Sequence, residues 1–401
     1  MRGFEPSFAM GTITLRSGHV QPVYAGHPWV YEQAIGRVDG APAPGDPVRV
    51  IDPQSNYLGS GFWSPKSAIP VRLITRAPEE RLDEAALVRR LERAATFRRE
   101  SLRLPNDETN GYRLINAEGD TLPGLIVDVY GDVAVAQFRT AGMKRHEDAL
   151  SAQIARVAGV KTVVGAAAAV QSEGLDDEHR VLRGRDPDGL SFRERGLEWS
   201  IPRSITQKTG YYFDQRENRA HLEQLAFGRV LDVYSFVGGM GLAAARGRSE
   251  HVTCVDSSAV AIATGASAAE HNGLGAKMRF EKQDAKKYLP ELVRRGERFD
   301  VVVLDPPKLA PTKRHLESAR KAYVQLNKLG AQLVNSGGLL VTCSCSAAIR
   351  PSDFVRAVNE GVRQARRDGI LVALGGQGPD HLTPLAFSEG RYLKTLFLRV
   401  E

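Results

Sequence analysis

Two of the three cysteines stand close together, in the sequence Thr342-Cys-Ser-Cys-Ser346. A cysteine thiolate is a nucleophile that can form a transient covalent bond with a substrate. Residues 338–345 are predicted to form a strand, and side-chain alternation would then point Cys343 and Cys345 toward the same face. Buried cysteine is also ordinary packing material, and we assign that role to Cys254, which lies inside another predicted strand. We expect one member of the 343/345 pair to reach a substrate.

Small and acidic residues follow the other strands predicted in this half of the chain. Three glycines in Asp232-Val-Tyr-Ser-Phe-Val-Gly-Gly-Met-Gly241 would let the backbone turn tightly and approach a ligand, although a plain strand–helix turn would use them too. Asp256 ends the next strand, where it could accept hydrogen bonds from two ribose hydroxyls or cap a helix. Asp284 ends a third strand and could accept a hydrogen bond from the amine of adenine. The candidate cofactor-binding residues here are Asp232, Tyr234, Ser235, Gly238, Gly239, Gly241, Asp256 and Asp284.

This register of strand-end residues resembles class I methyltransferases that use S-adenosyl-L-methionine (SAM). The glycines lack the strict G-x-G-x-x-G spacing of dinucleotide-binding proteins, and SAM has no phosphate for a helix N-terminus to bind. Asp305-Pro-Pro-Lys308, after a fourth strand, resembles the D/N-P-P motif of methyltransferases that act on a base. In that motif the acid holds the polar edge of the base and the prolines stiffen the loop, whereas a plain strand-ending turn is the alternative. Pro306, Pro307 and Lys308 are therefore candidate substrate-binding residues.

A cysteine beside an acid would suit one demanding reaction. Carbon 5 of cytosine is a poor nucleophile and becomes enamine-like only after a thiolate has added to carbon 6. After methyl transfer, a base removes the proton from carbon 5 and the thiol is eliminated. The reaction needs one cysteine at the mouth of the sheet and an acid near N3 of the ring. Cys343 or Cys345, together with Asp305, would meet this need.

The elements that must position these residues are predicted to form a doubly wound α/β domain. From about residue 229, strands that are apolar throughout alternate with helical stretches, which is typical of a parallel sheet covered on both faces. The N-terminal part has short strands separated by Gly and Pro, which predict a small β-barrel or sandwich. The middle is predicted to be a mixed α+β unit with a hairpin over residues 125–138. We therefore predict three domains: 1–76, 77–190 and 191–401.

Composition limits the class of protein. Of 401 residues, 42% are hydrophobic and 25% are charged, an ordinary globular balance. Three cysteines argue against a disulfide scaffold and for a reducing cytoplasm. We find neither a secretory signal nor an apolar run of about 18 residues, and expect a soluble cytoplasmic protein with no membrane partner and no metal. The formal charge of +7 favours a polyanionic partner.

Longer segments extend the resemblance over nearly the whole chain. Gln207-Lys-Thr-Gly-Tyr-Tyr-Phe-Asp-Gln-Arg-Glu-Asn-Arg219 resembles the Q-K-T-G-x-[FY]-x-D-Q-R-x-N-R signature of the bacterial large-subunit rRNA cytosine-5 methyltransferases, the RlmI-like family. Residues 112–128 are similar to the middle domain of that family. His27-Pro-Trp-Val-Tyr31 and Gly61-Phe-Trp-Ser-Pro-Lys-Ser67 resemble its N-terminal PUA domain, a small β-barrel that binds RNA.

The resemblance implies a PUA domain, a central α+β domain and a Rossmann-like class I methyltransferase domain, with SAM as cofactor and 23S rRNA as substrate. It also points to a homodimer. The family carries a Thr/Ser-Cys-Ser motif seven residues beyond a Gly-Gly turn, and counting from Gly337-Gly338 leads to Cys345. Cys345 would then be the nucleophile, and Asp305 would hold the N3 and N4 edge of the cytosine. The residues that the resemblance places near the methionine part of SAM are Lys208, Gly210, Phe213, Asp214 and Arg216.

An RNA contact has no motif of its own in this sequence. A helix predicted over 82–104 carries six arginines, which could form either a solvated face or a stripe that contacts phosphates. They are Arg89, Arg90, Arg93, Arg98, Arg99 and Arg103. The target base would have to be unpaired or flipped into the site.

Two other functions fit parts of the pattern. The first is methylation of a ring or exocyclic nitrogen of a base, with Asp305 holding the amine and no covalent step. Such sites usually place an aromatic residue fourth in the motif, where this chain has Lys308, and this difference favours methylation of carbon. The second is a non-catalytic RNA-binding assembly factor, against which the intact glycines and acids argue.

Overall fold

The computed structural model describes residues 10–166, 170–175, 179–202, 210–310 and 313–401. These residues form two compact units. Unit 1 comprises Met1–Arg193, Thr206–Tyr211 and Pro379–Gly390, and unit 2 comprises Glu194–Ile205, Tyr212–Gly378 and Arg391–Glu401. The division into three domains stays a prediction.

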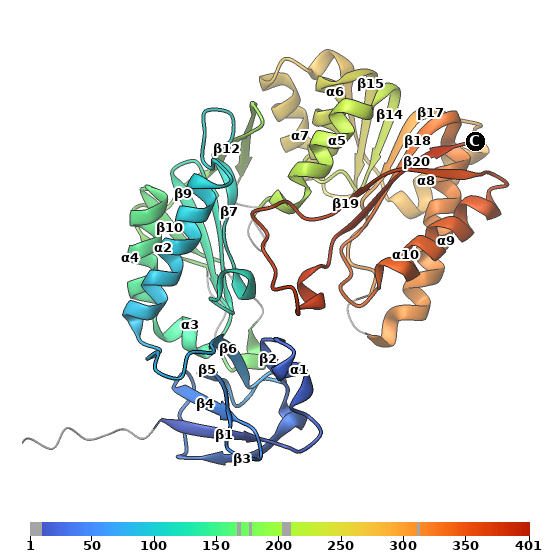
Figure 1. The fold of residues 1–401 in the computed structure, drawn as a ribbon. Helices are drawn as coiled ribbons and strands as arrows, with labels where there is room; N and C mark the ends of the chain where they lie inside the picture. Colours follow the sequence, from blue (N-terminus) through green and yellow to red (C-terminus); the bar gives the residue numbers. More distant parts are fainter. Residues whose placement is uncertain (1–9, 167–169, 176–178, 203–209, 311–312) are drawn as a thin grey trace, which may run out of the picture. The chain divides into compact units, whose positions relative to one another are not determined.

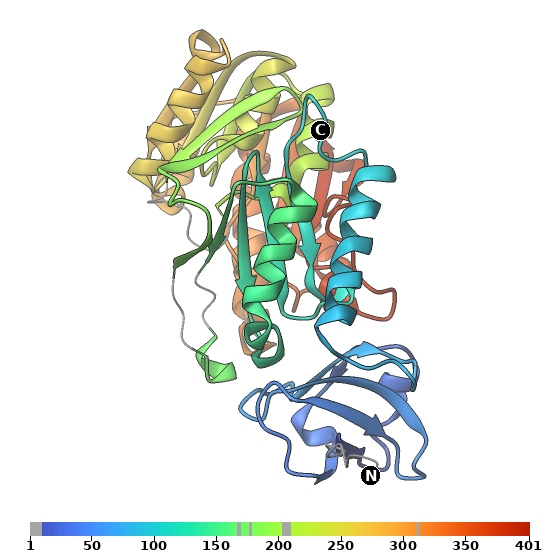
Figure 2. The ribbon, with the colours of Figure 1, turned by 90° about the vertical axis from the view of Figure 1, so that its left-hand side faces the viewer.

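The N-terminal part of unit 1 is a six-stranded sheet in the order β2-β6-β5-β4-β1-β3, drawn in blue in Figures 1 and 2. Alternating side chains of these short strands, such as Ile13 and Leu15 or Val48 and Val50, are buried in one apolar cluster. The elements are β1 (Gly11–Leu15), α1 (Gln21–Tyr24), β2 (Trp29–Val30), β3 (Ile35–Asp39), β4 (Pro47–Ile51), β5 (Tyr57–Trp63) and β6 (Val71–Thr75). The prediction of a small all-β domain is confirmed.

The rest of unit 1 is built on a five-stranded sheet in the order β11-β10-β9-β8-β7. The predicted hairpin is present as β8 and β9, which pair antiparallel around Gly131 at φ +59°. Helices α2 and α4 pack against each other and share one apolar core with the sheet (Figure 1). The elements are α2 (Glu84–Glu100), β7 (Gly111–Asn116), β8 (Leu125–Tyr130), β9 (Val133–Phe138), α3 (Ala141–Arg145), α4 (Glu147–Ala158), β10 (Thr162–Gly165) and β11 (Arg180–Arg183).

Two of the six arginines around α2 are not on a solvent-facing surface. Arg98 is fully buried and forms a bidentate ion pair with Asp120, and Arg90 is buried against Glu80. Neither guanidinium can reach a phosphate or solvent, so both sequence-based interpretations are wrong for this pair. The arginines that remain exposed are Arg89, Arg93, Arg99 and Arg103.

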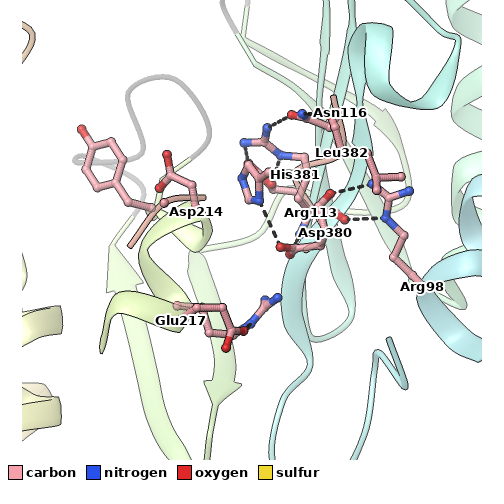
Figure 3. A network of polar contacts seen from close by, with 12 residues as sticks. Arg98, Arg113, Asn116, Asp214, Glu217, Asp380, His381 and Leu382 are labelled. Atoms are coloured by element: carbon pink, nitrogen blue, oxygen red, sulfur yellow. Dashed lines mark hydrogen bonds and ion pairs between the residues drawn. The ribbon is translucent and has the colours of Figure 1, made fainter. Parts of the chain in front are cut away.

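Unit 1 is completed by a segment from far along the chain, Pro379–Gly390, which the sequence did not reveal. The carbonyl of Asp380 accepts a hydrogen bond from Arg98 (2.6 Å), and its carboxylate accepts one from the amide of Arg113 (2.9 Å). The carbonyl of Leu382 accepts one from the side chain of Asn116 (2.8 Å). Figure 3 shows these contacts.

Unit 2 contains a seven-stranded sheet in the order β16-β15-β14-β17-β18-β20-β19. The first five strands in this order are parallel, and β20 is antiparallel to both of its neighbours. The strands are β14 (Phe227–Val233), β15 (Arg248–Asp256), β16 (Met278–Lys282), β17 (Phe299–Leu304), β18 (Val334–Ser344), β19 (Gly369–Gly375) and β20 (Lys394–Val400). The chain starts at β14 and moves outward to β16 before it crosses to β17, so a crevice is expected where β14 and β17 end.

Helices cover both faces of this sheet, which explains why its strands are apolar throughout. Alternate side chains of the central strands pack on α5 and α6 in one cluster, and on α8, α9 and α10 in another. The helices are α5 (Arg216–Leu225), α6 (Gly239–Arg246), α7 (Ala259–His271), α8 (Ala285–Arg294), α9 (Leu316–Leu333) and α10 (Pro351–Gln364). A separate two-stranded sheet pairs β12 (Gly189–Glu194) with β13 (Leu197–Pro202).

Among the described residues, no helix combines the length and apolar character needed to span a membrane. Within the same residues, no cluster of three or more His, Cys, Asp or Glu side chains is arranged to hold a metal ion.

Candidate active site

The loop after β14 is held by hydrogen bonds from its backbone amides to two carboxylates. Asp232 is buried, and its Oδ2 accepts a hydrogen bond from the amide of Gly241 (2.8 Å), which fixes the start of α6. Asp256, at the end of β15, accepts hydrogen bonds from the amides of Phe236 (2.9 Å) and Ser258 (2.8 Å). The cap of α7 is Ser258 itself, so Asp256 does not act as the helix cap. The two acids therefore shape the loop between them.

The loop also contains strained backbone. Tyr234 (φ 63°) and Phe236 (φ 51°) adopt left-handed conformations although neither is glycine. Such conformations cost about 1–3 kcal/mol each and tend to occur where a backbone is held for binding or catalysis. Gly238 (φ +80°) adopts the same region without that cost.

Packing explains two of the glycines. A Cβ at Gly241 would lie 2.2 Å from Sγ of Cys254, and one at Gly238 would lie 2.9 Å from the ring of Phe280. These glycines let α6 and the loop lie against neighbouring strands. Cys254 is buried in the apolar core, which is the packing role predicted for it. Gly239 begins α6 and is buried.

Asp284 follows β16 and is exposed. Its carboxylate accepts a hydrogen bond from the amide of Lys286 (2.8 Å) and so caps α8. Asp284 thus lies at the carboxyl edge of the sheet, as the register of the strand ends required.

Asp305 directly follows β17 and is held by a residue that the sequence did not single out. Its Oδ2 accepts a hydrogen bond from Nε2 of Gln215 (2.8 Å), and the amide oxygen of Gln215 is in turn held by Asn218 (2.5 Å). Burial and, after it, the charge of the nearby Asp214 raise the pKa of Asp305 to about 7, although the hydrogen bond from Gln215 opposes the shift. Gln215 lies in the Asp-Gln-Arg part of the sequence signature, which was the one signal that could have singled it out.

The two candidate cysteines lie in different environments. Cys343 is within β18, fully buried, with Sγ 3.3 Å from Oγ1 of Thr395 on β20. Cys345 lies just beyond the end of β18 and is partly exposed. Since β17 and β18 pair in parallel, Cys345 and Asp305 follow adjacent strand ends. Burial raises the pKa of the Cys345 thiol, and Asp305 and Asp214 raise it further, while Lys308 lowers it.

The residues at the start of α5 and just before it lie at the carboxyl edge of the unit 2 sheet, as Asp305 does. Asp214 is buried, and its carboxylate accepts a hydrogen bond from the Tyr392 hydroxyl (2.7 Å). Its backbone carbonyl accepts a hydrogen bond from the amide of Gly378 (3.0 Å). Phe213 and Arg216 are also buried. Lys208 lies outside the described residues.

Tyr212 is a further residue that the sequence did not single out. Its side chain is 53% exposed and packs edge-on to Phe236 at 5.5 Å. Partial burial and, after it, the charges of Asp214, Asp305 and Cys345 raise the pKa of Tyr212 to about 12. The ring therefore offers an aromatic surface near the acid and the thiol. In the Asp-Pro-Pro loop, Pro306 is buried, and Pro307 and Lys308 are exposed.

Comparison with known sequences identifies the family of this chain. A family model described as S-adenosylmethionine-dependent methyltransferase matches residues 152–373, and one described as a PUA-like domain matches residues 13–76. The ribosomal RNA large subunit methyltransferase I of Tolumonas auensis is 35% identical over 394 residues, 97% of this chain and 99% of that protein. The same enzyme of Shewanella denitrificans is 36% identical over 395 residues, with the same coverage. The chain belongs to the ribosomal RNA large subunit methyltransferase I family.

Solved structures share the fold of this methyltransferase I chain over nearly its whole length. The crystal structure of a methyltransferase complexed with SAH has a TM-score of 0.82 at 19% identity, and covers 97% of this chain and 99% of its own. A protein from Streptococcus mutans described as a SAM-dependent methyltransferase has a TM-score of 0.81 with the same identity and coverage. The predicted order of a PUA-like domain before a Rossmann-like methyltransferase domain is confirmed.

SAM is the cofactor of this methyltransferase I family member, and the residues at the carboxyl edge of the sheet fit it. Oδ1 of Asp232 and Oγ of Ser235 are buried, and neither has a hydrogen-bond partner among the described residues. Unpaired buried polar atoms are destabilising, so this part of the loop is suited to a polar ligand. Burial, moreover, raises the pKa of Asp232 to about 7.

Proposed function

We propose that this chain methylates carbon 5 of a cytosine in 23S rRNA, with Cys345 as the covalent nucleophile and Asp305 as its acid partner. One observation carries the proposal. The partly exposed thiol of Cys345 follows β18 beside Asp305 at the end of β17, whereas Cys343 is enclosed in the core. A thiol and an acid at adjacent strand ends are the two groups that addition to carbon 6 requires.

Asp305 suits the role of acid because its raised pKa of about 7 leaves part of the population protonated near neutral pH. The protonated carboxyl donates its proton to N3 of the ring while the Cys345 thiolate adds to carbon 6. The bond formed at carbon 6 leaves carbon 5 electron-rich. Bound SAM supplies the methyl group to carbon 5. A base such as water then takes the proton from carbon 5, and the electrons of that bond re-form the C5–C6 double bond and expel the sulfur as the Cys345 thiolate. N3 returns its proton to Asp305, which restores both groups.

The remaining predicted site residues divide between cofactor and base. Oδ1 of Asp232 and Oγ of Ser235, both unpaired, would bind polar groups of SAM beside Tyr234, Gly238 and Gly239. Asp256 would accept the ribose hydroxyls, because it sits at the end of the second strand with its carboxylate near the loop. The residues proposed to complete the cofactor site are Gly241, Asp284, Lys208, Phe213, Asp214 and Arg216. Pro306, Pro307 and Lys308 would line the base.

The choice of rRNA as substrate follows the relatives, which are named as large-subunit ribosomal RNA methyltransferases. The PUA-like domain supplies a module suited to RNA, and the net charge of +7 favours a polyanion. The homodimer and the cytoplasmic location stay predictions.

The experiment is to incubate the full chain with labelled SAM and unmethylated 23S rRNA and to map the product by mass spectrometry. We expect 5-methylcytosine, at least 10³-fold less of it with Cys345→Ala, and activity within a few fold of wild type with the matched variant Cys343→Ala. An RNA containing 5-fluorocytosine should trap a covalent adduct with wild type and none with Cys345→Ala.

Other products would refute parts of the proposal. Full activity of Cys345→Ala would remove the nucleophile assignment. A methylated nitrogen would establish the alternative in which Asp305 holds an amine and no covalent bond forms. SAM and rRNA binding without turnover on any rRNA would indicate an assembly factor.

A further inference from the structure

A buried lysine lies behind the candidate nucleophile. Lys394 is the first residue of β20, where it pairs with Ser344 at the end of β18. Its side chain is only 7% exposed. Its Nζ donates hydrogen bonds to the carbonyl oxygens of Ser346 (2.7 Å) and Ile349 (3.0 Å). Both carbonyls belong to the turn that immediately follows Cys345.

Further hydrogen bonds fix the turn that follows Cys345. The amide of Ile349 donates a hydrogen bond to the carbonyl of Ser346 (3.1 Å). Oγ of Ser346 accepts a hydrogen bond (3.1 Å) from the amide of Ala310, which lies in the loop that begins at Asp305. The turn is thereby fixed both to β20 and to the Asp305 loop. A neutral apolar side chain in place of Lys394 would remove the lysine's hydrogen bond from the Ile349 carbonyl and leave the Ser346 carbonyl with the Ile349 amide as its donor.

The lysine is also a cation without a carboxylate partner, since no ion pair of Lys394 occurs among the described residues. Burial lowers its pKa to about 8, and Cys345 acts in the opposite direction. Because such an interaction is reciprocal, the ammonium favours the Cys345 thiolate as much as the thiolate favours the ammonium. At neutral pH the lysine is still mostly charged.

In the part of the chain that the structure describes, no other group near Cys345 is a buried cation that could stabilise its thiolate. Asp305 and Asp214 disfavour a thiolate, and Lys308 favours one but is exposed. Thiolates that act as nucleophiles need positive charge nearby. The titratable groups around Cys345 are Asp214, Asp305, Lys308, Tyr212, Tyr323, Cys343 and Lys394. Lys394 is the buried cation of this set.

We propose that Lys394 is a positioning residue that holds the turn after Cys345 and stabilises the Cys345 thiolate from behind. The inference rests on the proposed function in so far as Cys345 is the nucleophile. It gives a role to a buried charged group that the sequence pattern left without one.

The test is the pH dependence of Cys345 alkylation by iodoacetamide in the full chain, with the modified cysteine located by mass spectrometry. We expect Lys394→Met to slow alkylation at pH 7 by about tenfold, because the ammonium is still charged there and a nearby opposite charge shifts a pKa by about one unit. Well above pH 8 the lysine is neutral, and the two rates should converge. Lys394→Arg retains the charge and should keep the alkylation rate at pH 7 near that of wild type. The matched control is Lys321→Met, which removes an exposed lysine on α9 and should leave the alkylation rate at pH 7 unchanged.

An unchanged alkylation rate at pH 7 in a folded Lys394→Met protein would overturn the proposal. Thermal unfolding of each variant shows whether it is folded, and Lys394→Gln serves if the methionine variant is not. If neither neutral variant folds, a tenfold slower alkylation at pH 7 in Lys394→Arg would contradict a role for the charge. Alkylation requires neither RNA nor SAM, so a failure of cytosine methylation and a failure of this proposal are separate results.

Discussion

Asp305 and Cys345 form a pair in which both groups resist ionisation. Burial is the main cause for each, and the charge of Asp305 further disfavours the Cys345 thiolate. The pair therefore loses its first proton near pH 7 and its second above the ordinary thiol range. Because the two groups interact, these steps belong to the pair as a whole. Between the two steps one proton is shared, and a fixed fraction of molecules has the thiolate beside the protonated acid.

This sharing predicts the pH profile of the reaction. Below pH 7 both groups are protonated and no thiolate exists, and above the thiol pKa both are ionised and no acid remains. We expect kcat/KM to rise with increasing pH, with a midpoint at about pH 7, to be constant above this pH, and to fall at alkaline pH. Asp305→Asn should lower the rate by about 10²–10⁴-fold and remove the limb at pH 7. The exposed Asp368→Asn serves as control, and a limb at pH 7 that survives in Asp305→Asn would refute the assignment.

At the scale of elements, the junction of β14 and α6 contains a carboxyl group whose burial disfavours its charged form. Asp232 is 1% exposed, and burial raises its pKa from 3.8 to about 7. The folded state thus binds a proton more tightly than the unfolded chain does. The free energy of unfolding should therefore fall as pH rises from about 4 to about 7, and stay lower above that.

Asp232→Asn should separate stability from binding. The amide oxygen of asparagine can still accept the Gly241 amide, but it carries no charge to bury. We expect unit 2 to be more stable at pH 8 by about 1–4 kcal/mol, since one pKa unit corresponds to about 1.4 kcal/mol. The gain should shrink toward pH 5. SAM affinity should fall at the same time, as measured by calorimetry. A variant that gains as much at pH 5 as at pH 8 would exclude ionisation as the cause.

The sheet of unit 2 could be predicted because its central strands are apolar throughout and carry polar residues at their ends. Side-chain alternation could not choose between Cys343 and Cys345. The strand ends at Ser344, so Cys345 no longer follows the alternation that encloses Cys343. Lys394 could not be predicted, because it reaches the Cys345 turn only through the antiparallel return of β20.

The arginines of α2 illustrate the same limit in unit 1. Helical spacing alone places charged side chains on faces, but the acids that bury Arg90 and Arg98 lie outside the helix, at Glu80 and Asp120. A sequence pattern within one element does not contain its tertiary partners. The small N-terminal β domain was predictable because its strand and turn signals are local.

At the scale of the whole molecule, the two compact units do not follow the order of the chain. Pro379–Gly390 lies between β19 and β20 in sequence, yet it belongs to unit 1. Phe387 packs on Trp29 at 4.7 Å, and a Cβ at Gly119 would lie 2.0 Å from the carbonyl of Leu382. The segment is therefore an integral part of the packing of unit 1. Contacts across more than 260 residues, such as that of Arg113 with Asp380, leave no local trace in the sequence.

This topology predicts that a substitution near the C-terminus destabilises a strand near residue 113. In Asp380→Ala, the amide of Arg113 loses the carboxylate that accepts its hydrogen bond (Figure 3). A lost bond to a charged acceptor costs about 1.5–3 kcal/mol, so amides of β7 should exchange with deuterium about 10- to 150-fold faster. Peptides from β17 in unit 2 provide the internal reference, and the exposed Asp368→Ala provides the control. Equal acceleration in β7 and β17 would mean a general loss of stability, and no acceleration in β7 would mean that the segment does not support unit 1.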